Sequence, residues 1–234
     1  MKKAIILFTR LPIEGKTKTR LQKVFSPKEC AKLHIAFLKD LNICLNNLDI
    51  DYFIYYTPDK DNKLLVDIFQ KAKAYKLQEG IDLGEKMYNA IFEVLESGYD
   101  SCVLIGSDIP QINSKDFFRA FDDLNYTDIV LGPTLDYGYY LVGMKRPHLE
   151  VFKNQVYGEG SVLKNTIESI KNANLEYKLI NSHLDIDEPE DVFNYSQKML
   201  LNEVDKGSFT SLYIELLMKE YETIWSELKD YESM

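Results

Sequence analysis

The chain has few of the residues that build disulfide frameworks or thiolate metal sites. Among its 234 residues there are three cysteines, Cys30, Cys44 and Cys102. They are odd in number and widely spaced, so they form neither a disulfide framework nor a CxxC metal pair. A reducing compartment is therefore expected.

Two common catalytic patterns are also missing. The three histidines, His34, His148 and His183, show no metal-ligand spacing, so a histidine-based zinc site lacks support. Ser107 is not part of a GxSxG elbow, so a serine hydrolase lacks support as well.

Long apolar runs are absent. The run Ala4 to Phe8 breaks at Thr9-Arg10, too short for the core of a signal peptide, and no later stretch reaches the length of a membrane span. We therefore expect a soluble, cytoplasmic protein that does not contact a membrane.

Positive charge is scarce, with 28 Lys and Arg against 37 Asp and Glu and a formal net charge of -9. Nucleic-acid binding needs cations spread over a broad face, so no nucleic-acid partner is expected. A small anion bound in a local basic pocket remains compatible with this balance.

The length and the 45% hydrophobic content allow one substantial core. We expect one domain over residues 1–202 and a helical extension over 203–234. The extension carries an apolar stripe from Leu212 to Leu228, including Ile224 and Trp225. We interpret this stripe as packing or as a homodimer contact.

A basic loop follows the first apolar run. In Gly15-Lys16-Thr17-Lys18-Thr19-Arg20, a flexible glycine and three cations lie at the carboxyl end of a predicted strand, where α/β sheets bind phosphates. A P-loop would need glycine five positions before Gly15, where Arg10 stands. We interpret the loop as an anion site; the alternative is a solvated basic turn at the start of a surface helix.

Strand-length apolar runs alternate with helical patterns. The capping box Ser26-Pro27-Lys28-Glu29 predicts a helix to about Leu48, and a four-residue apolar spacing predicts another over Leu83 to Leu95. The predicted strands are 4–8, 52–56, 102–105, 128–131 and 139–142, with weaker candidates near Tyr75 and Leu179. This alternation predicts an α/β fold with a mostly parallel sheet covered on both faces, and a ligand crevice at the carboxyl ends of the strands.

One connection breaks the parallel pattern. The segment between 128–131 and 139–142 is too short for a crossover helix, so one of these strands is expected to run antiparallel or to lie outside the main sheet.

Asp108 follows a predicted central strand, in the sequence Ser107-Asp108-Ile109-Pro110. A carboxylate there can hold Mg²⁺ (or Mn²⁺) while the ion bridges to substrate phosphates. Unit charges about 4 Å apart interact by roughly 4 kcal/mol at an effective dielectric of 20, so a triphosphate would bind poorly beside a bare carboxylate. The alternative is that Asp108 caps the turn before Pro110.

A further loop carries candidate residues. In the turn-rich segment 132–138, Gly138 permits a close backbone approach and Asp136 is polar, so the loop could wall an acceptor pocket. We interpret Tyr139 and Tyr140 as packing residues.

An acidic segment, 184–191, packs five carboxylates ahead of a helix predicted over 192–201. Asp187 suits the N-cap, Pro189 an early helical position, and Glu190 and Asp191 the positive end of the helix. Asp185 is left over as a second metal ligand, with Asp187 as a further candidate.

Together the motifs LFTRLPIEGKTKTRL, LQEGIDLGEKM, GSDIP, LGPTLDYGYYLVGM and LDIDEPEDV, in this order, carry a family resemblance. The sequence resembles the bacterial DUF2064 family, glycosyltransferase-like or nucleotidyltransferase-like proteins of the three-layer α/β/α glycosyltransferase-A fold. It is also similar, more distantly, to 2-phospholactate and molybdenum cofactor guanylyltransferases. The resemblance covers about Ala4 to Met199.

The resemblance also implies roles for single residues. Asp108 would bind the metal, and Asp136 and Gly138 would face the acceptor. The family usually has Asp-Gly-Gly where this chain has Asp136-Tyr137-Gly138. The residues implied at the nucleotide are Arg10, Gly15, Lys18, Thr19, Arg20, Asp82 and Gly84.

Three functions are compatible with these residues. The first is a Mg²⁺-dependent nucleotidyltransferase, in which Lys18 and Arg20 stabilise developing charge and Asp108 holds the metal. The second is a glycosyltransferase that uses a nucleotide-sugar donor and the same metal. The third is a nucleotide-binding module without catalysis, which only Tyr137 in place of glycine supports.

Overall fold

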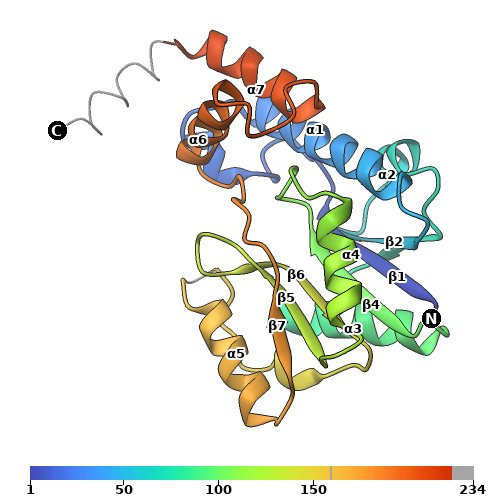
Figure 1. Cartoon of the computed structure of the whole chain (residues 1–234). Coiled ribbons are helices and arrows are strands. Elements are labelled where there is room, and N and C mark those ends of the chain that lie inside the picture. The colour runs from blue at the N-terminus through green and yellow to red at the C-terminus, as the bar shows by residue number, and fades with distance from the viewer. Residues whose placement is uncertain (159, 223–234) are drawn as a thin grey trace. The chain divides into compact units, whose positions relative to one another are not determined.

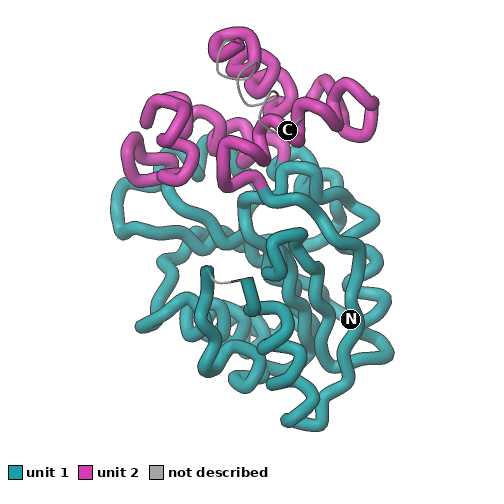
Figure 2. The backbone as a smooth tube through the Cα atoms, turned by 90° about the vertical axis from the view of Figure 1, so that its left-hand side faces the viewer, with its two compact units in different colours: residues 1–11, 41–185 teal, residues 12–40, 186–234 magenta. Residues whose placement is uncertain are grey.

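The computed structural model describes residues 1–158 and 160–222. The described chain divides into two compact units, one of residues 1–11 and 41–185 and the other of residues 12–40 and 186–222 (Figure 2). We call them unit 1 and unit 2. Neither boundary falls at the predicted 202/203 division, which stays a prediction, and Ile224, Trp225 and Leu228 of the predicted stripe lie outside the described residues.

Unit 1 is built on a seven-stranded sheet within the described part of the chain, in the order β3-β2-β1-β4-β6-β5-β7. The strands are β1 (Lys3–Arg10), β2 (Asp51–Thr57), β3 (Ala74–Leu77), β4 (Ser101–Gly106), β5 (Ile129–Pro133), β6 (Tyr139–Met144) and β7 (Tyr177–Leu179). Each predicted run, the two weaker ones included, coincides with one of these strands, so the expected strand pattern is confirmed.

The strand directions follow the sequence prediction. β1 pairs parallel with β2 and β4, with Ile5 opposite both Tyr52 and Val103. β6 pairs antiparallel with β4 and β5, and β5 pairs parallel with β7. The sheet is therefore parallel except for β6, and the strand expected to break the pattern is confirmed.

Helices cover both faces of the sheet. On one face, Met87 and Ile91 of α3 (Leu83–Glu96) and Ile170 of α5 (Val162–Asn172) share a buried cluster with Ile6 and Leu104 of the central strands. On the other face lies α4 (Ser114–Asp123). The side chain of Leu124, directly after α4, lies next to Gly143 of β6, and so does the side chain of Val103 of β4. Figure 1 shows this layering of α3, α5 and α4 about the strands. The predicted mostly parallel α/β fold is confirmed.

Unit 1 also contains two short helical segments, α2 (Lys63–Ile68) and η2 (Leu149–Val151), and residues 41–46 at the end of α1 (Pro27–Asn46). The helix predicted over 83–95 is α3, and its spacing buries Met87, Ile91 and Leu95 as expected, while Leu83 stays 43% exposed. Full burial of one large aliphatic side chain contributes roughly 1.5–3 kcal/mol, so the periodic residues account for the attachment of α3.

Unit 2 joins two distant parts of the sequence. It contains η1 (Thr19–Lys23), the first part of α1 (Pro27–Asn46), α6 (Pro189–Leu200) and α7 (Phe209–Glu220). Its core packs Leu21 and Phe37 against Ile186, Val192 and Ile214. The predicted capping box at the start of α1 is confirmed, because Ser26 N–H donates to Glu29 Oε2 at 2.7 Å and Glu29 N–H to Ser26 Oγ at 3.3 Å.

One residue ties α7 to α1. The Asp40 carboxylate accepts the backbone N–H groups of Phe209 and Thr210, each at 2.8 Å. These are donors that the first turn of a helix leaves without partners, and a carboxylate there also opposes the positive helix end. The carboxyl-terminal part of the described chain thus belongs to the packed core of unit 2.

No helix among the described residues is long and apolar enough to cross a membrane.

Candidate functional site

Three candidate carboxylates of unit 1 lie on loops at one edge of the sheet. Asp108 follows β4, Asp136 follows β5 and Asp185 follows β7, and these three strands point the same way. Carboxyl ends of parallel strands meet at one edge, where α/β folds bind their ligands. Asp108 and Asp185 are half-buried and Asp136 is exposed.

The segment after β7 holds two of these loops together. His183 N–H donates to Pro133 O at 3.1 Å, and Leu135 N–H donates to His183 O at 3.2 Å. Gln111 Nε2, in the loop after β4, donates to Leu184 O at 2.9 Å. The stretch next to Asp185 is therefore bonded both to the loop that carries Asp136 and to the loop that carries Asp108.

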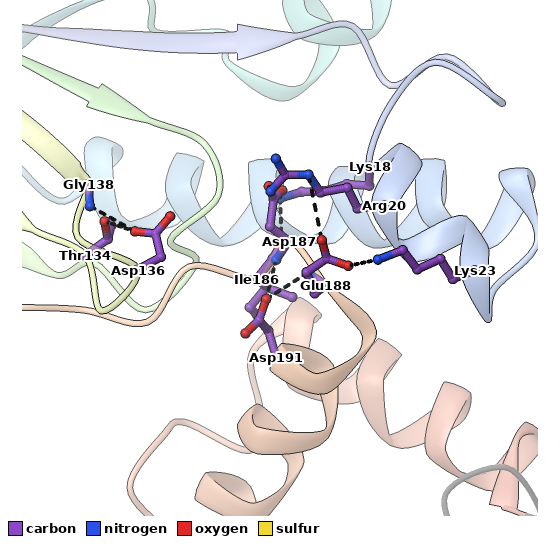
Figure 3. A network of polar contacts seen from close by, with 10 residues as sticks. All are labelled: Lys18, Arg20, Lys23, Thr134, Asp136, Gly138, Ile186, Asp187, Glu188 and Asp191. Carbon is purple, nitrogen blue, oxygen red and sulfur yellow. Dashed lines mark hydrogen bonds and ion pairs between the residues drawn. The ribbon is translucent and has the colours of Figure 1, made fainter. Parts of the chain in front are cut away.

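The Asp136 carboxylate closes its own turn (Figure 3). It accepts the Thr134 hydroxyl and, at 3.1 Å, the Gly138 N–H. A β-carbon at Gly138 would lie 2.9 Å from Thr134 Oγ1. This close approach accounts for glycine at position 138 without any need for a bound ligand. Asp136 thus has a structural role in the turn as well as its predicted role at the acceptor.

Tyr137, at the position where the resemblance implies glycine, has a left-handed backbone with φ 69° and a side chain that is 69% exposed. This conformation is favourable for glycine and costs other residues roughly 1–2 kcal/mol. The loop therefore keeps the backbone shape that glycine favours while it presents an aromatic ring to solvent.

The tyrosines beside this loop are neutral phenols. Burial, and then the neighbouring phenol of Tyr157, raise the pKa of Tyr139 well above its ordinary value. Burial raises the pKa of Tyr157 to about 12. Burial, with a smaller contribution from Asp116, also raises the pKa of Tyr140. These hydroxyls can donate hydrogen bonds near neutral pH but cannot act as bases there.

Asp82 and Gly84 both have structural roles at the start of α3. The Asp82 carboxylate accepts the Glu85 N–H at 2.8 Å as the N-cap of the helix. A β-carbon at Gly84 would lie 2.6 Å from Phe152 O, so only glycine fits there. Their predicted place at the nucleotide stays a prediction.

In unit 2, Lys18 is buried within the basic loop. Its ammonium donates to Ile186 O at 2.6 Å and pairs with Asp187 at 3.2 Å (Figure 3). It also lies 5.2 Å from the centre of the Phe37 ring. The side chain is only 3% exposed, and the backbone is left-handed with φ 52°. Strained backbone of this kind persists only where its surroundings fix it, and it gathers at functional sites.

Arg20 is the accessible cation beside Lys18. Its side chain is 53% exposed, and it pairs with Asp187 at 3.3 Å and with Glu188 at 3.7 Å. Glu188 also accepts Lys23 at 2.7 Å. The basic loop and the acidic segment therefore form one network of opposite charges.

The expected N-cap role of Asp187 is wrong. α6 begins at Pro189 with Glu188 as its N-cap, three residues before the predicted start at 192. The Asp191 carboxylate accepts the N–H groups of Asp187 at 3.0 Å and Glu188 at 2.7 Å. Asp191 occupies the helix end, and this leaves the carboxylate of Asp187 to pair with the cations.

The remaining residues predicted to bind the nucleotide are exposed. Arg10 is the exposed last residue of β1, and Thr19 is exposed at the start of η1. Gly15 has φ 77°, and a β-carbon there would have open space around it, so the backbone conformation alone accounts for the glycine.

The carboxylates at this edge of unit 1 have the oxygen donor atoms that a hard cation prefers. Within residues 1–158 and 160–222, no three His, Cys, Asp or Glu side chains are close enough to form a metal centre by themselves. Mg²⁺ does not need such a centre, because it binds through one or two carboxylates plus substrate phosphates and waters. Asp108 and Asp185, on segments joined through Gln111 and Leu184, offer oxygen ligands of this kind.

The sequence prediction missed the ion pairs between the two charged segments. Lys18 and Ile186 lie 168 residues apart in the sequence, and each segment had a sufficient local explanation. The one signal in the sequence was the number of carboxylates in 184–191, which is larger than one helix end needs. Asp191 alone accepts the N–H groups of both Asp187 and Glu188.

The fold places the protein in the class of nucleotide-diphospho-sugar transferase and nucleotidyltransferase folds. The structure of a candidate nucleotide-diphospho-sugar transferase from Desulfovibrio desulfuricans G20 is similar, with 30% identity, coverage of 97% of this chain and 98% of that chain, and a TM-score of 0.85. A cytidylyltransferase from Leptospira borgpetersenii serovar Hardjo-bovis (strain JB197) shares the fold alone, with 16% identity, coverage of 96% of each chain and a TM-score of 0.58.

The family model described as "Uncharacterized protein conserved in bacteria (DUF2064)" matches residues 41–159, and the chain belongs to this family. A 2-phospho-L-lactate guanylyltransferase from Methanocaldococcus sp. (strain FS406-22) is 29% identical over 181 residues, which cover 75% of this chain and 74% of the relative. The DUF2064 resemblance and the similarity to 2-phospholactate guanylyltransferases are confirmed. These named relatives are transferases.

Proposed function

We propose that the protein is a nucleotidyltransferase that joins a nucleoside triphosphate to a small phosphorylated acceptor. One observation carries the proposal: the loops with Asp108 and Asp136 are both bonded to the segment that leads into Asp185, at the carboxyl edge of a parallel sheet. The proposal draws further support from the guanylyltransferase relatives, which make GTP the first donor to try.

In the proposed reaction, a phosphate oxygen of the acceptor attacks the α-phosphorus of the triphosphate. The bond from the α-phosphorus to the bridging oxygen breaks, and pyrophosphate leaves with that oxygen. Bound Mg²⁺ would supply charge neutralisation at the phosphates, held by Asp108 and Asp185, with Asp187 as a further candidate.

The cations of the basic loop have the complementary role. Arg20 is half-exposed, and its guanidinium, which can donate two hydrogen bonds to one phosphate, would bind the donor phosphates. Lys18 would stabilise charge that develops on the leaving group. Arg10, Gly15 and Thr19 would line the same phosphates. Asp187 weakens the positive field of Lys18 and Arg20, so donor phosphates compete with an internal carboxylate for both cations.

On the acceptor side, the exposed loop 134–138 would receive the phosphorylated molecule. Asp136 is committed to the Thr134 and Gly138 bonds, so its role there would be to fix the shape of the loop. The exposed ring of Tyr137 would then be the side chain nearest to the acceptor.

A glycosyltransferase is the second candidate, and one observation favours it. The Desulfovibrio desulfuricans structure with 30% identity is named for nucleotide-diphospho-sugar transfer. In that reaction the acceptor attacks the anomeric carbon of the sugar, and a nucleoside diphosphate leaves. The basic loop favours nucleotidyl transfer, because leaving pyrophosphate needs more cationic support.

Incubation with labelled nucleoside triphosphates and with nucleotide sugars, in Mg²⁺ and with a panel of small phosphorylated acceptors, separates the two. Released pyrophosphate is the result expected here, and released nucleoside diphosphate from a sugar donor would establish the second candidate. Binding of nucleotide without either product would favour a non-catalytic module. Asp108→Ala is the control for background hydrolysis.

A further inference from the structure

His183 lies at a junction of three parts of unit 1. It belongs to the segment between β7, which ends at Leu179, and Asp185. Its backbone forms a parallel bridge with Thr134, through an N–H bond to Pro133 O at 3.1 Å and a carbonyl bond from Leu135 N–H at 3.2 Å. The loop that carries Asp136 therefore starts from a fixed backbone.

The His183 ring is fixed by a buried carboxylate. His183 Nε2 lies 3.0 Å from Asp116 Oδ2, and the two side chains are 16% and 1% exposed. The carboxylate of Asp116 only accepts, so this contact is a hydrogen bond when the proton is on Nε2. The Tyr140 ring meets the imidazole edge-on, with centroids 4.9 Å apart.

Asp116 is itself part of the start of α4. The same oxygen that contacts His183 accepts the Asn113 N–H at 3.0 Å in the capping box of the helix. The His183 ring thus connects the segment after β7 to the first turn of α4. The next residue, Leu184, is held by Gln111 from the loop after β4.

The described segment between β7 and α6 contains no helix and no strand of the sheet, so it depends on bonds of this kind, which include one from the Tyr140 hydroxyl to Asn181 O at 3.1 Å. Ordering a residue outside a helix or strand costs conformational entropy that only such contacts can offset. Ligands must be held to a fraction of an ångström, because a displacement of about 1 Å can cost a hundredfold in rate. Asp185 lies two residues from His183, so a shift of the backbone at His183 would also displace the Asp185 carboxylate.

We propose that His183 is a positioning residue, which holds Asp185 for the metal and the Asp136 loop for the acceptor through its bond to Asp116 and its two backbone bonds. The proposal rests on the proposed function for what Asp185 and the loop bind. The imidazole does not touch the reacting groups in this account; it acts through the segment that it anchors.

The test compares His183→Ala with His183→Gln and Asp123→Asn. Glutamine keeps an N–H donor at a similar reach, so it can restore the bond to Asp116. Asp123 is a matched control: it is a buried carboxylate on the same helix, 5% exposed, and it pairs with Arg119 at 2.6 Å and Lys178 at 2.9 Å near the other end of α4. Its substitution should lower stability without disturbing Asp185.

Binding of Mn²⁺ in the presence of GTP, followed by electron paramagnetic resonance, is the first readout. We expect His183→Ala to weaken Mn²⁺ binding at least about tenfold, while His183→Gln and Asp123→Asn stay within about threefold of the parent chain. Parent-like binding by His183→Ala, or equal losses in His183→Ala and Asp123→Asn, would overturn the proposal.

Amide hydrogen exchange is the second readout, and it needs no ligand. We expect faster exchange at Leu135 and over 180–185 in His183→Ala, and not in Asp123→Asn. If the parent chain fails to bind Mn²⁺ and GTP, the proposed function fails while exchange still decides whether His183 holds these segments. Unchanged exchange would overturn the positioning role whatever the nucleotide result.

Discussion

The two units hold their candidate residues in different ways. In unit 1, Asp108 and Asp185 lie on loops fixed by bonds to backbone groups, such as Gln111 to Leu184 O. In unit 2, Lys18 and Arg20 are held directly by the carboxylate of Asp187. The loops of the unit 1 acids are thus fixed to one another through backbone groups, whereas the two cations of unit 2 are held by a side-chain carboxylate of their own unit.

This difference separates substitutions that test the site from substitutions that also lower stability. An isosteric change such as Asp to Asn keeps the volume of the side chain and an acceptor oxygen. Removal of a buried ammonium leaves its polar partners without a donor, and this lowers the free energy of unfolding. The predictions below use this contrast.

The largest effect is expected at Asp108. Asp108→Asn keeps the shape of the side chain but removes the charge proposed to hold the metal, and we expect turnover to fall at least about a hundredfold, or roughly 3 kcal/mol of barrier. The melting temperature should change little. Steady-state kinetics with GTP as donor and calorimetry of unfolding measure the two effects; turnover within about threefold of the parent would contradict the metal role.

The next effect contrasts Lys18 and Arg20 in unit 2. Lys18→Met keeps the buried stem but leaves Ile186 O and Asp187 without the ammonium, so we expect a loss of about 1–3 kcal/mol in the free energy of unfolding. Arg20→Gln should cost less than about 0.5 kcal/mol, because that pair is exposed.

Urea unfolding and nucleotide titration of these two variants belong together. We expect nucleotide affinity to fall about tenfold or more in both, although only Lys18→Met is destabilised. Lys16→Gln, a change at an exposed neighbouring cation, is the control. A stable Lys18→Met variant would show that the Asp187 pair does not hold the loop.

A smaller effect is expected at the loop after β5. Tyr137→Gly relieves the left-handed strain but increases the entropy of the unfolded chain, so the two terms should nearly cancel, with a change within about 1 kcal/mol. Activity should persist, with a change mainly in the KM of the acceptor. If glycine instead gave turnover to an inactive parent chain, Tyr137 would be the reason for a non-catalytic module.

The smallest effect concerns pH and the contact of Tyr221 with Glu29, at 2.6 Å in unit 2. Burial acts to raise the pKa of Glu29, but hydrogen bonds from Tyr221 and Ser26 outweigh it and hold the pKa below its ordinary value. A carboxyl with a depressed folded pKa adds stability above its unfolded pKa, about 4.3, and loses it as pH falls through the folded pKa.

Tyr221→Phe should therefore be less stable than the parent chain by under about 1 kcal/mol at pH 7, and the difference should shrink below about pH 4. Thermal unfolding between pH 3 and pH 7 measures it. Tyr99→Phe, which removes the bond to Asp51 at 2.7 Å, is the parallel case in unit 1 and should show the same trend: burial acts to raise the pKa of Asp51, but bonds from Tyr99 and Lys73 hold it below its ordinary value. A difference that does not change with pH would contradict the Glu29 assignment.

The sequence predicted unit 1 better than unit 2, for a physical reason. Strand runs such as 102–105 and the apolar spacing of α3 are local signals, and one short connection was enough to identify the antiparallel strand. The core of unit 2 joins residues 12–40 to residues 186–222, and no local pattern carries that pairing.

The same distinction applies to the candidate residues. Asp108 and Asp136 were predictable because each follows a recognisable strand. The Lys18 pair with Asp187 and the His183 pair with Asp116 were not, since each partner already had an ordinary local role. Asp116 is an N-terminal helix residue, and Asp187 precedes a helix in a way that suits an N-cap, which proved to be Glu188.

Calorimetric titration of GTP into the protein, with and without Mg²⁺, tests the central claim most directly. We predict binding that strengthens at least about tenfold with Mg²⁺, and the loss of this gain in Asp108→Asn while Arg20→Gln weakens binding with or without the ion. Absence of GTP binding under both conditions, or an equal Mg²⁺ gain in the parent chain and Asp108→Asn, would contradict the account.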